Sequence, residues 1–340
     1  MLTISKRNSL KSSEAGVKYF VLGALSSGIL LYGCSLIYGF TGSTNFIEIY
    51  LSLIEFEKLN YGILFGLIFI LVGLSFKISA VPFHMWTPDV YEGSPTAITA
   101  FFAIVPKIAA IILIFRFCLE PFINFINEWR QIIIFLSIAS MFVGSIAAIF
   151  QKNLKRLLAY SSIGHIGYIL IALASANIEG IKGLIIYSTI YLLMNVAIFT
   201  IILSIKIKDR YIEMINDLSG ISDKKPIISL CISIIMFSMA GIPPFAGFFG
   251  KFYIFVAALE SNLLYLAILG VIASVISAYY YLRIVKVMYF ENSNFEYSLI
   301  FSKKANLILI LSIFAFTFFI FYPSLLIDLS VQISNSYFGM

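Results

Sequence analysis

Long apolar runs separated by short polar segments constrain this 340-residue chain more than any other feature. A helix that crosses a bilayer needs about 20 consecutive apolar residues. On this criterion we predict spans at residues 16–39, 61–82, 97–118, 131–150, 158–176, 181–205, 227–259, 262–288 and 305–325. With 61% hydrophobic and 12% charged residues, the chain cannot cover a water-exposed surface, so a soluble enzyme is excluded. The expected fold is all-α, a polytopic transmembrane helix bundle of about nine spans.

The basic residues are distributed unevenly about these spans. With the span-end residues Arg116, Lys182, Arg283 and Lys286 counted with the adjacent loops, 15 of the 23 Lys and Arg residues lie on the side of the N-terminus, 4 lie on the opposite side and 4 lie within spans. Because loops rich in Lys and Arg stay cytoplasmic or matrix-facing, we predict the N-terminus on that side and the C-terminus outside. The membrane would be a bacterial inner membrane or the mitochondrial inner membrane. The net charge of +6 then follows from topology, and no nucleic-acid partner is predicted.

Two of the predicted spans contain prolines that are expected to break them. Pro82 closes span 61–82, and Pro243 and Pro244 interrupt span 227–259. Proline lacks a backbone N–H and blocks the carbonyl group one turn earlier. Non-helical backbone survives at membrane depth only where it is buried in protein or lines a wet cavity. We therefore expect two broken helices, with a plain proline kink as the alternative. Span 227–259 is treated as one crossing, because two crossings would reverse the later charge bias.

Apart from Lys182 and Lys286, which lie at span ends and are counted with the loops, four lysines lie within the predicted spans: Lys18, Lys77, Lys107 and Lys251. A lysine near the bilayer centre costs about 3 kcal/mol and is retained mainly where it faces a bundle interior or water. Lys18 lies so near the start of its span that snorkelling to the interface explains it equally well. Lys107 is central in its span and has no such route at about 1.5 Å per residue. Because burial disfavours the charged form, a row of buried lysines predicts a proton relay.

Polar residues at similar depth provide candidate links for such a relay: Ser79, Tyr160, Ser161, Ser162 and His165. A second histidine, His84, lies in a polar segment directly after Pro82 and predicts the mouth of a channel. Histidine is the side chain that most readily exchanges protons near neutral pH. A purely structural role remains an open alternative for both histidines.

No cofactor site is predicted on this chain. Cys34, Cys118 and Cys231 lie far apart without CxxC spacing, and two histidines are too few for haem or a metal centre. The segment 247–251 superficially resembles a phosphate-binding loop, but Phe252 stands where that loop needs Ser or Thr. We therefore expect no metal, nucleotide or redox group bound here.

Four segments of the chain resemble the antiporter-like membrane subunits of respiratory complex I. They are FKISAVPFHMWTPDVYEGSP at 76–95, VPKIA at 105–109, NLKRLLAYSSIGHIGY at 153–168 and AGIPP at 240–244, the last followed by Lys251. The resemblance extends over essentially the whole chain. It implies a proton-pumping subunit with a fourteen-helix fold built from two inverted repeats of five helices. This chain would contain helices six to fourteen.

The resemblance also implies how the chain divides. Residues 1–130 would be the remainder of the first inverted repeat, with the spans at 16–39, 61–82 and 97–118. Residues 131–290 would form the second repeat, and residues 291–340 the C-terminal span and tail.

Roles for individual residues follow from the same resemblance. Lys77 would accept protons in the first half-channel, Lys107 would be the central relay lysine and Lys251 would serve the second half-channel. Lys18 and His165 would be auxiliary relay residues. NADH, FMN, iron–sulfur clusters and quinone would belong to other subunits of the complex. The partners of this chain would be the other complex I membrane subunits and the lipid bilayer.

The sequence departs from the family pattern at one point. In the family, a glutamate on the fifth helix pairs with the lysine of the seventh, and this sequence begins after that helix. None of the 17 acidic residues lies within a predicted span. Burying Lys77 in its charged form without a partner would be costly. We therefore expect another chain, or an upstream segment, to supply the missing helices, as in a fragment, a late start codon or a split gene.

Two other functions fit the same residues. A subunit of an Mrp-type cation/proton antiporter would share both broken helices and the lysines. A membrane scaffold would use the lysines only to contact lipid or partner helices. Copurification of peripheral redox subunits would favour complex I, whereas Na⁺-dependent transport would favour the antiporter.

Overall fold

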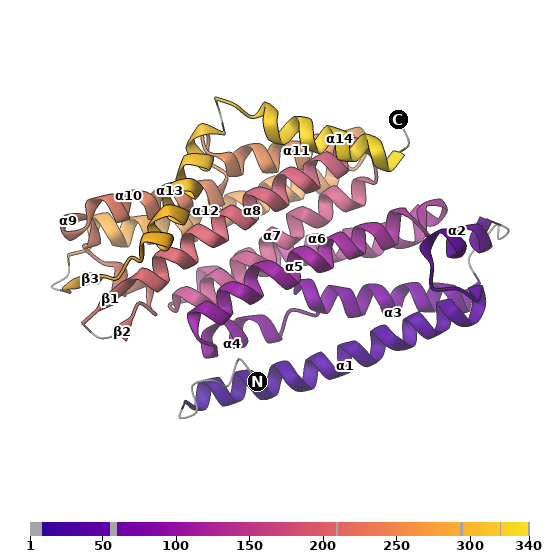
Figure 1. Cartoon of the computed structure of the whole chain (residues 1–340), viewed down its shortest axis with the longest axis horizontal. Coiled ribbons are helices and arrows are strands. Elements are labelled where there is room, and N and C mark those ends of the chain that lie inside the picture. The colour runs from indigo at the N-terminus through magenta and orange to yellow at the C-terminus, as the bar shows by residue number, and fades with distance from the viewer. Residues whose placement is uncertain (1–8, 55–59, 209, 293–294, 320, 339–340) are drawn as a thin grey trace.

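The computed structural model describes residues 9–54, 60–208, 210–292, 295–319 and 321–338. Within these residues, seven helices are long and apolar enough to cross a membrane. They contain α1 (Leu10–Thr41), α3 (Tyr61–Ile78), α5 (Thr96–Leu119), α6 (Ile126–Ile149), α7 (Leu154–Ser175), α8 (Ile178–Ser204) and α12 (Leu264–Phe290). Most run along the long axis of the molecule (Figure 1). The prediction of an all-α transmembrane bundle is confirmed.

Shorter elements complete the chain. The helices are α2 (Phe46–Ile54), α4 (Trp86–Gly93), η2 (Ile123–Phe125), η3 (Ile215–Leu218), α9 (Ile221–Lys224), α10 (Pro226–Ala240), α11 (Ala246–Glu260), α13 (Lys303–Phe318) and α14 (Ser324–Phe338). The strands β1 (Ile205–Ile207), β2 (Arg210–Tyr211) and β3 (Tyr297–Leu299) form a small antiparallel sheet in the order β2-β1-β3. This sheet lies at one end of the bundle, whereas α2 lies at the other (Figure 1).

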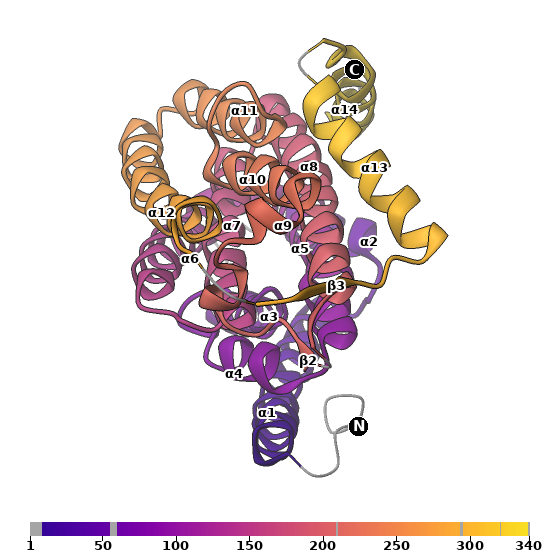
Figure 2. The same cartoon turned by 90° about the vertical axis from the view of Figure 1, so that its left-hand side faces the viewer.

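Helix α7 lies near the centre of the bundle when it is viewed along the helices (Figure 2). In its most apolar stretch 94% of the residues are buried, compared with 17% for α1, which lies at the edge. Its neighbours include α6, α8, α11 and α4. The central position of α7 means that its polar side chains find their partners within the protein.

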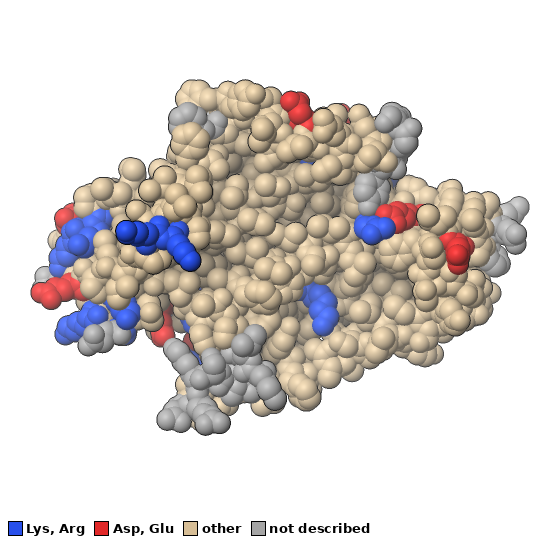
Figure 3. All heavy atoms as spheres, viewed as in Figure 1, with Lys and Arg blue, Asp and Glu red and all other residues tan. Residues whose placement is uncertain are grey.

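Charged side chains are sparse over the middle of the visible surface, where an isolated basic group interrupts a largely uncharged area (Figure 3). They gather at the end that holds α9 and the small sheet, with a few more near the opposite end, and the surface between is almost wholly uncharged. A bilayer core excludes charged groups in this way. The surface pattern therefore agrees with helices that cross a membrane from one end of the molecule to the other.

Both predicted helix breaks are present. Helix α3 ends at Ile78, Ser79 adopts a left-handed conformation with φ 65°, and α4 begins at Trp86 after the cis bond to Pro82. Helix α10 ends at Ala240, Gly241 adopts φ 83°, and α11 begins at Ala246 after a cis bond between the two prolines. Each break therefore consists of a left-handed residue followed by a turn containing proline.

The predicted boundaries differ from the structure most at two places. Helix α1 begins at Leu10 rather than residue 16, so Glu14 lies inside a spanning helix. The last predicted span, 305–325, ends earlier, because α13 stops at Phe318 and Pro323 cannot continue a helix. A separate helix, α14, follows it and was not predicted, since its polar residues interrupt the apolar run. The division into two inverted repeats at residue 130 stays a prediction.

Candidate functional site

Helix α7 carries the central residues of the candidate site. Its backbone packs closely against α6, because a Cβ added to Gly144 would lie only 2.6 Å from the backbone nitrogen of Gly164. Asn153 caps the start of α7, its side chain accepting a hydrogen bond from the backbone of Arg156. The close packing brings Ser161, Ser162 and His165 within reach of polar side chains on the surrounding helices.

Lys107 lies inside α5 and its side chain is fully buried. Its Nζ donates a hydrogen bond to Ser162 Oγ on α7 at 2.7 Å and lies 5.4 Å from the ring centroid of Tyr91 on α4. The Ser162 hydroxyl donates in turn to the carbonyl oxygen of Ala159 at 2.7 Å. An ammonium group placed over an aromatic face is attracted by the ring quadrupole. The amine of Lys107 therefore joins α4, α5 and α7.

His165 lies one helical turn beyond Ser162 on α7. Its Nδ1 is 2.7 Å from the hydroxyl of Tyr187 on α8, and its Nε2 is 3.0 Å from the hydroxyl of Tyr281 on α12. The same Tyr281 hydroxyl is hydrogen-bonded to Ser161. A neutral imidazole donates through one ring nitrogen and accepts through the other. Hydrogen-bonded on both sides, His165 has the geometry to receive a proton on one nitrogen and release one from the other.

Lys251 lies on α11, just beyond the second helix break, and its side chain is buried. Its Nζ donates to the carbonyl oxygen of Ala240, the last residue of α10, at 2.7 Å. It also lies 4.9 Å from the ring centroid of Tyr168 on α7. The C-terminal end of a helix attracts a positive charge through its unpaired carbonyl groups. The break therefore creates the acceptor that holds this ammonium group.

A small cavity of about 10 Å³ lies between His165 and Lys251, with Ser161, Tyr168 and Tyr281 also in its walls. About this volume is needed to hold the centre of one water molecule, and the walls offer several hydrogen-bonding groups. The histidine and the lysine thus share one polar space inside the bundle.

The remaining predicted relay residues are placed differently. Lys77 occupies the last turn of α3, half-buried, with its Nζ 6.0 Å from the ring centroid of Phe76. Within the described part of the chain, no hydrogen bond or ion pair is found for its ammonium group. His84 lies half-buried in the turn between α3 and α4, and its buried Nδ1 has no hydrogen-bond partner among the described residues. The roles predicted for both residues stay predictions.

Two of the polar links predicted from the sequence lie outside this network. Ser79 Oγ is buried at the first break and has no hydrogen-bond partner among the described residues. Tyr160 is half-buried on α7 and is not among the residues that contact Lys107, His165 or Lys251. Of the five predicted links, the structure brings together Ser161, Ser162 and His165.

Lys18 lies in a charged cluster near the start of α1, away from the other relay lysines. Its Nζ donates to Asp89 at 2.6 Å and pairs with Glu14 at 2.5 Å, with 40% of its side chain exposed. Asp89 lies on α4, whereas Glu14 lies one turn before Lys18 on α1. The ion pairs, rather than snorkelling alone, account for the position of this lysine.

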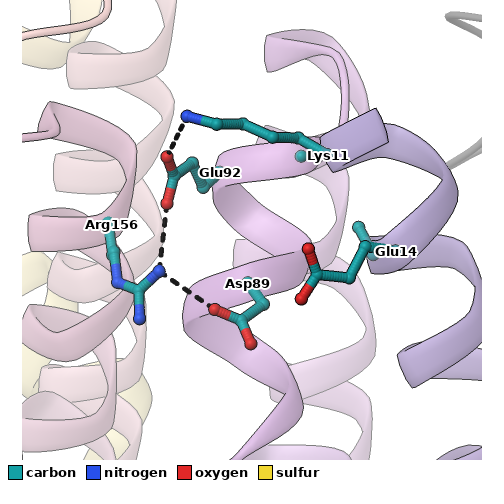
Figure 4. A pocket seen from close by; sticks show the side chains of 7 residues that line it. Lys11, Glu14, Asp89, Glu92 and Arg156 are labelled. Atoms are coloured by element: carbon teal, nitrogen blue, oxygen red, sulfur yellow. Dashed lines mark hydrogen bonds and ion pairs between the residues drawn. The ribbon is translucent and has the colours of Figure 1, made fainter. Parts of the chain in front are cut away.

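Glu14 and Asp89 of this cluster also line a surface pocket of about 210 Å³ between α1, α4 and α7 (Figure 4). Arg156 of α7 reaches Asp89 at 3.0 Å and Glu92 at 3.1 Å, and Lys11 of α1 donates to Glu92 at 2.8 Å. Burial alone would raise the pKa of Glu92, but hydrogen bonds from Lys11 and Arg156 lower this pKa below its usual 4.5. The pocket is therefore a balanced network of opposite charges that ties three helices together.

Sequence reasoning missed several members of the site. Tyr187 and Tyr281 lie 22 and 116 residues from the histidine that they contact, and nothing in the local sequence distinguishes them from core aromatic residues. Asp89 and Glu92 lie three residues apart, which places them on one face of a helix, but their partner Arg156 is 64 residues from Glu92. The spacing of the two acids was the one local signal available.

Comparison with known proteins identifies the class. Residues 1–277 match the family described as NADH:quinone oxidoreductase/Mrp antiporter, transmembrane. The chain belongs to this family, which is the one predicted from its motifs. Two broken helices and buried lysines facing a central helix are thus found in a chain of antiporter-like type.

Individual relatives narrow the comparison. The chain is 59% identical over 297 residues to NADH-quinone oxidoreductase subunit N of Pelagibacter ubique, a match that covers 87% of this chain and 62% of the relative. The chain thus spans about three fifths of the length of the curated relatives it matches. Residues 17–24 and 89–93 resemble subunit N more than other antiporter-like subunits, and this relative agrees with that resemblance.

Solved structures show the same fold. A chain of respiratory complex I from Thermus thermophilus with bound aureothin is 31% identical, with a TM-score of 0.77 over 94% of this chain and 69% of that chain. A chain of the Mrp complex from Dietzia sp. DQ12-45-1b gives a TM-score of 0.83 over 97% of this chain and 69% of that chain. At 22% identity, the second likeness shows the fold alone.

Proposed function

We propose that this chain is a proton-translocating membrane subunit of respiratory NADH:quinone oxidoreductase. The observation that carries the proposal is the pair of buried lysines, Lys107 and Lys251, which both contact α7. Lys107 is hydrogen-bonded to Ser162 of α7, and Lys251 lies over the ring of Tyr168, further along the same helix. The chain would serve as a subunit of the translocase. Electron transfer from NADH through FMN and iron–sulfur clusters to quinone would take place in other subunits.

The contacts suggest an order of proton transfer. A neutral Lys107 accepts a proton and, as an ammonium group, donates it to Ser162, whose hydroxyl releases its own proton toward His165 after turning away from the carbonyl oxygen of Ala159. His165, one turn away, accepts the proton on one ring nitrogen and releases the proton on the other. Lys251 then receives it across the shared cavity. At each transfer one group gains the proton that its neighbour loses, so the positive charge moves with the proton and leaves the site only when Lys251 releases it.

Lys77 would deliver protons to Lys107 from the first half-channel, with His84 at its mouth and Lys18 as an auxiliary group. The partner expected for Lys77 is a glutamate on a preceding helix, supplied by another chain or an upstream segment. The other partners would be further membrane subunits of the complex. We place the N-terminal side of the chain in the bacterial cytoplasm or the mitochondrial matrix, as the basic loops suggest.

The central test replaces Lys107 by alanine in the complete complex. We expect assembly to persist while NADH-driven proton uptake by inverted membrane vesicles falls at least about tenfold, because proton-transfer groups commonly contribute factors of that size or more. Lys152→Ala is the matched control, since Lys152 is an exposed basic residue just before α7. Wild-type proton uptake in an assembled Lys107→Ala complex would exclude the relay.

An Mrp-type cation/proton antiporter is the second candidate, favoured by the fold that the chain shares with the Dietzia complex. Purification of the chain from membranes in mild detergent separates the two functions. Peripheral flavin and iron–sulfur subunits that copurify support the first proposal. Mrp-type partners together with Na⁺-dependent proton transport would support the second.

A further inference from the structure

A buried lysine at the start of α7 is hydrogen-bonded to the end of α4. Only 4% of the surface of Lys155 is exposed, and its Nζ donates to the backbone carbonyl oxygens of Glu92 at 3.0 Å and Ser94 at 2.8 Å. The last carbonyl groups of a helix have no partner within it. Lys155 therefore satisfies carbonyl groups that the end of α4 leaves free.

The next residue, Arg156, forms ion pairs with side chains of α4. It bonds the carboxylates of Asp89 and Glu92 at 3.0 and 3.1 Å, at the edge of the surface pocket (Figure 4). We name the contacts of Lys155 and Arg156 with residues 89–94 the α4–α7 clamp. One half of the clamp is buried and directed at the backbone, whereas the other half is partly exposed and directed at side chains.

The two helices that the clamp joins are the two that hold the amine of Lys107. Tyr91, which lies between the clamped residues on α4, places its fully buried ring 5.4 Å from Lys107 Nζ. Ser162, two helical turns beyond Lys155 on α7, accepts the hydrogen bond from the same Nζ. A shift of α4 relative to α7 would therefore change one contact of the amine without changing the other.

We propose that Lys155 is a positioning residue, which sets the environment of Lys107 by fixing α4 against α7. This inference rests on the proposed function, because it assigns Lys107 a proton to carry. The other titratable groups around Lys107 are Tyr91 of α4, His165 of α7 and Tyr191 of α8, which donates to the carbonyl oxygen of Ala103 on α5. Of these groups, Tyr91 alone lies on the helix that the clamp holds.

The test uses the intact complex in inverted membrane vesicles. Lys155→Met keeps the length of the side chain but removes its donors, Lys155→Arg keeps donors, and Lys152→Met removes an exposed charge nearby as a control. We expect the complex with Lys155→Met to assemble. Its proton uptake per quinone reduced should fall at least about threefold, and the pH profile of that uptake should shift by about half a unit. Lys155→Arg should recover most of the uptake, and Lys152→Met should match the wild type.

A double-mutant cycle tests whether the effect passes through Tyr91. If it does, Lys155→Met should add little to Tyr91→Leu, because groups that act together give non-additive effects. Additive effects, or a lower proton uptake with an unchanged pH profile, would mean that Lys155 only stabilises the fold. Either result would overturn the proposal. An assembled Lys155→Met complex that behaves like the wild type would also overturn it.

Two further variants keep the outcome decisive. If Lys155→Met does not assemble, Asp89→Asn loosens the exposed half of the clamp, and it should shift the pH profile in the same direction as Tyr91→Leu. An unshifted profile in Asp89→Asn would then overturn the inference. Lys107→Ala separates the two proposals: if it abolishes uptake while Lys155→Met is neutral, the positioning role alone fails. If Lys107→Ala pumps normally, the proposed function fails as well.

Discussion

The two broken helices hold their lysines in different ways. At the second break, Lys251 follows the break and reaches back to the carbonyl oxygen of Ala240, with its side chain buried. At the first break, Lys77 precedes the break, is half-buried and has no hydrogen-bond partner within the described residues. Both amines nevertheless lie near the C-terminal end of the helix before the break, where a positive charge is favoured. The second break thus gives its lysine a carbonyl acceptor, whereas none is found for Lys77 within the described residues.

The difference lies in what surrounds each lysine. At the second break the lysine side chain is enclosed by α7 and α12, which supply Tyr168, Tyr281 and the polar cavity. At the first break the backbone N–H of Val81 donates to Ser140 of α6, but the buried Ser79 and Thr87 hydroxyls have no partner among the described residues. The second lysine is therefore bonded within the described residues, whereas Lys77 and two buried hydroxyls at the first break have no partner among them.

The largest effect is expected at the complete site. Replacing Lys251 with methionine removes the donor to Ala240 and the last group of the proposed relay, so NADH-driven proton uptake should fall at least about tenfold while the complex assembles. Proton uptake by inverted vesicles and the amount of assembled complex provide the two measurements. Unchanged proton uptake would show that the Lys251 amine is not part of the proton path.

The backbone of each break gives an opposite pair of predictions. Gly241→Ala should cost about 1–2 kcal/mol, because alanine resists the left-handed conformation. Its Cβ would also lie 2.9 Å from Lys251 Cδ. Ser79→Gly should change stability by less than about 0.5 kcal/mol, since relief of the left-handed serine offsets the extra freedom of glycine when unfolded. Thermal unfolding in detergent measures both, and equal effects would remove the distinction between the breaks.

The rate at which each lysine is acetylated should decrease as its amine becomes more deeply buried. In the detergent-solubilised chain, we expect Lys77 to be acetylated about tenfold faster than Lys251 and Lys107, because a buried amine reacts only when its surroundings open. Exposed Lys152 is the reference for a fully accessible amine. Mass spectrometry of timed samples gives the rates. Equal acetylation rates of Lys77 and Lys251 would mean that the amine of Lys77 is as well shielded as that of Lys251.

The smallest effect is expected from pH. The pKa of Glu92 is lowered in the folded protein, so its contribution to stability is present above the ordinary pKa of 4.5 and is lost as pH falls through the lower folded value. Partly exposed ion pairs contribute only about 0.2–1 kcal/mol. Hydrogen exchange in α4 should therefore increase below pH 4.5, but no similar change is expected in α10 and α11. Glu92→Gln should remove the pH dependence, and an unchanged response in this variant would assign it to another group.

Local sequence was sufficient for the framework of this protein. The apolar runs predicted the spanning helices, and Pro82 and Pro243 predicted where two of them break. These features depend on the hydrophobicity and the backbone geometry of neighbouring residues. The short helices α2 and α14 and the small sheet escaped prediction, because neither length nor periodicity distinguished them from loops.

The candidate site could be predicted only in part. The cost of burying a charge singled out Lys107 and Lys251 from the sequence, since it depends on residue type and depth alone. Their partners depend on which helices pack together. The hydrogen bond from Lys107 to Ser162 joins residues 55 positions apart, and that between His165 and Tyr281 joins residues 116 positions apart.

By itself, the sequence determined that the chain lies in a membrane, where its helices cross and break, and which lysines need an explanation. The tertiary structure alone decided that α7 lies at the centre, that α4 and α7 together hold Lys107, and that Lys18 joins a surface cluster instead of the buried line. Hydrophobicity acts through each residue and its neighbours, whereas hydrogen bonds and ion pairs need two groups in contact, and packing brings those groups together.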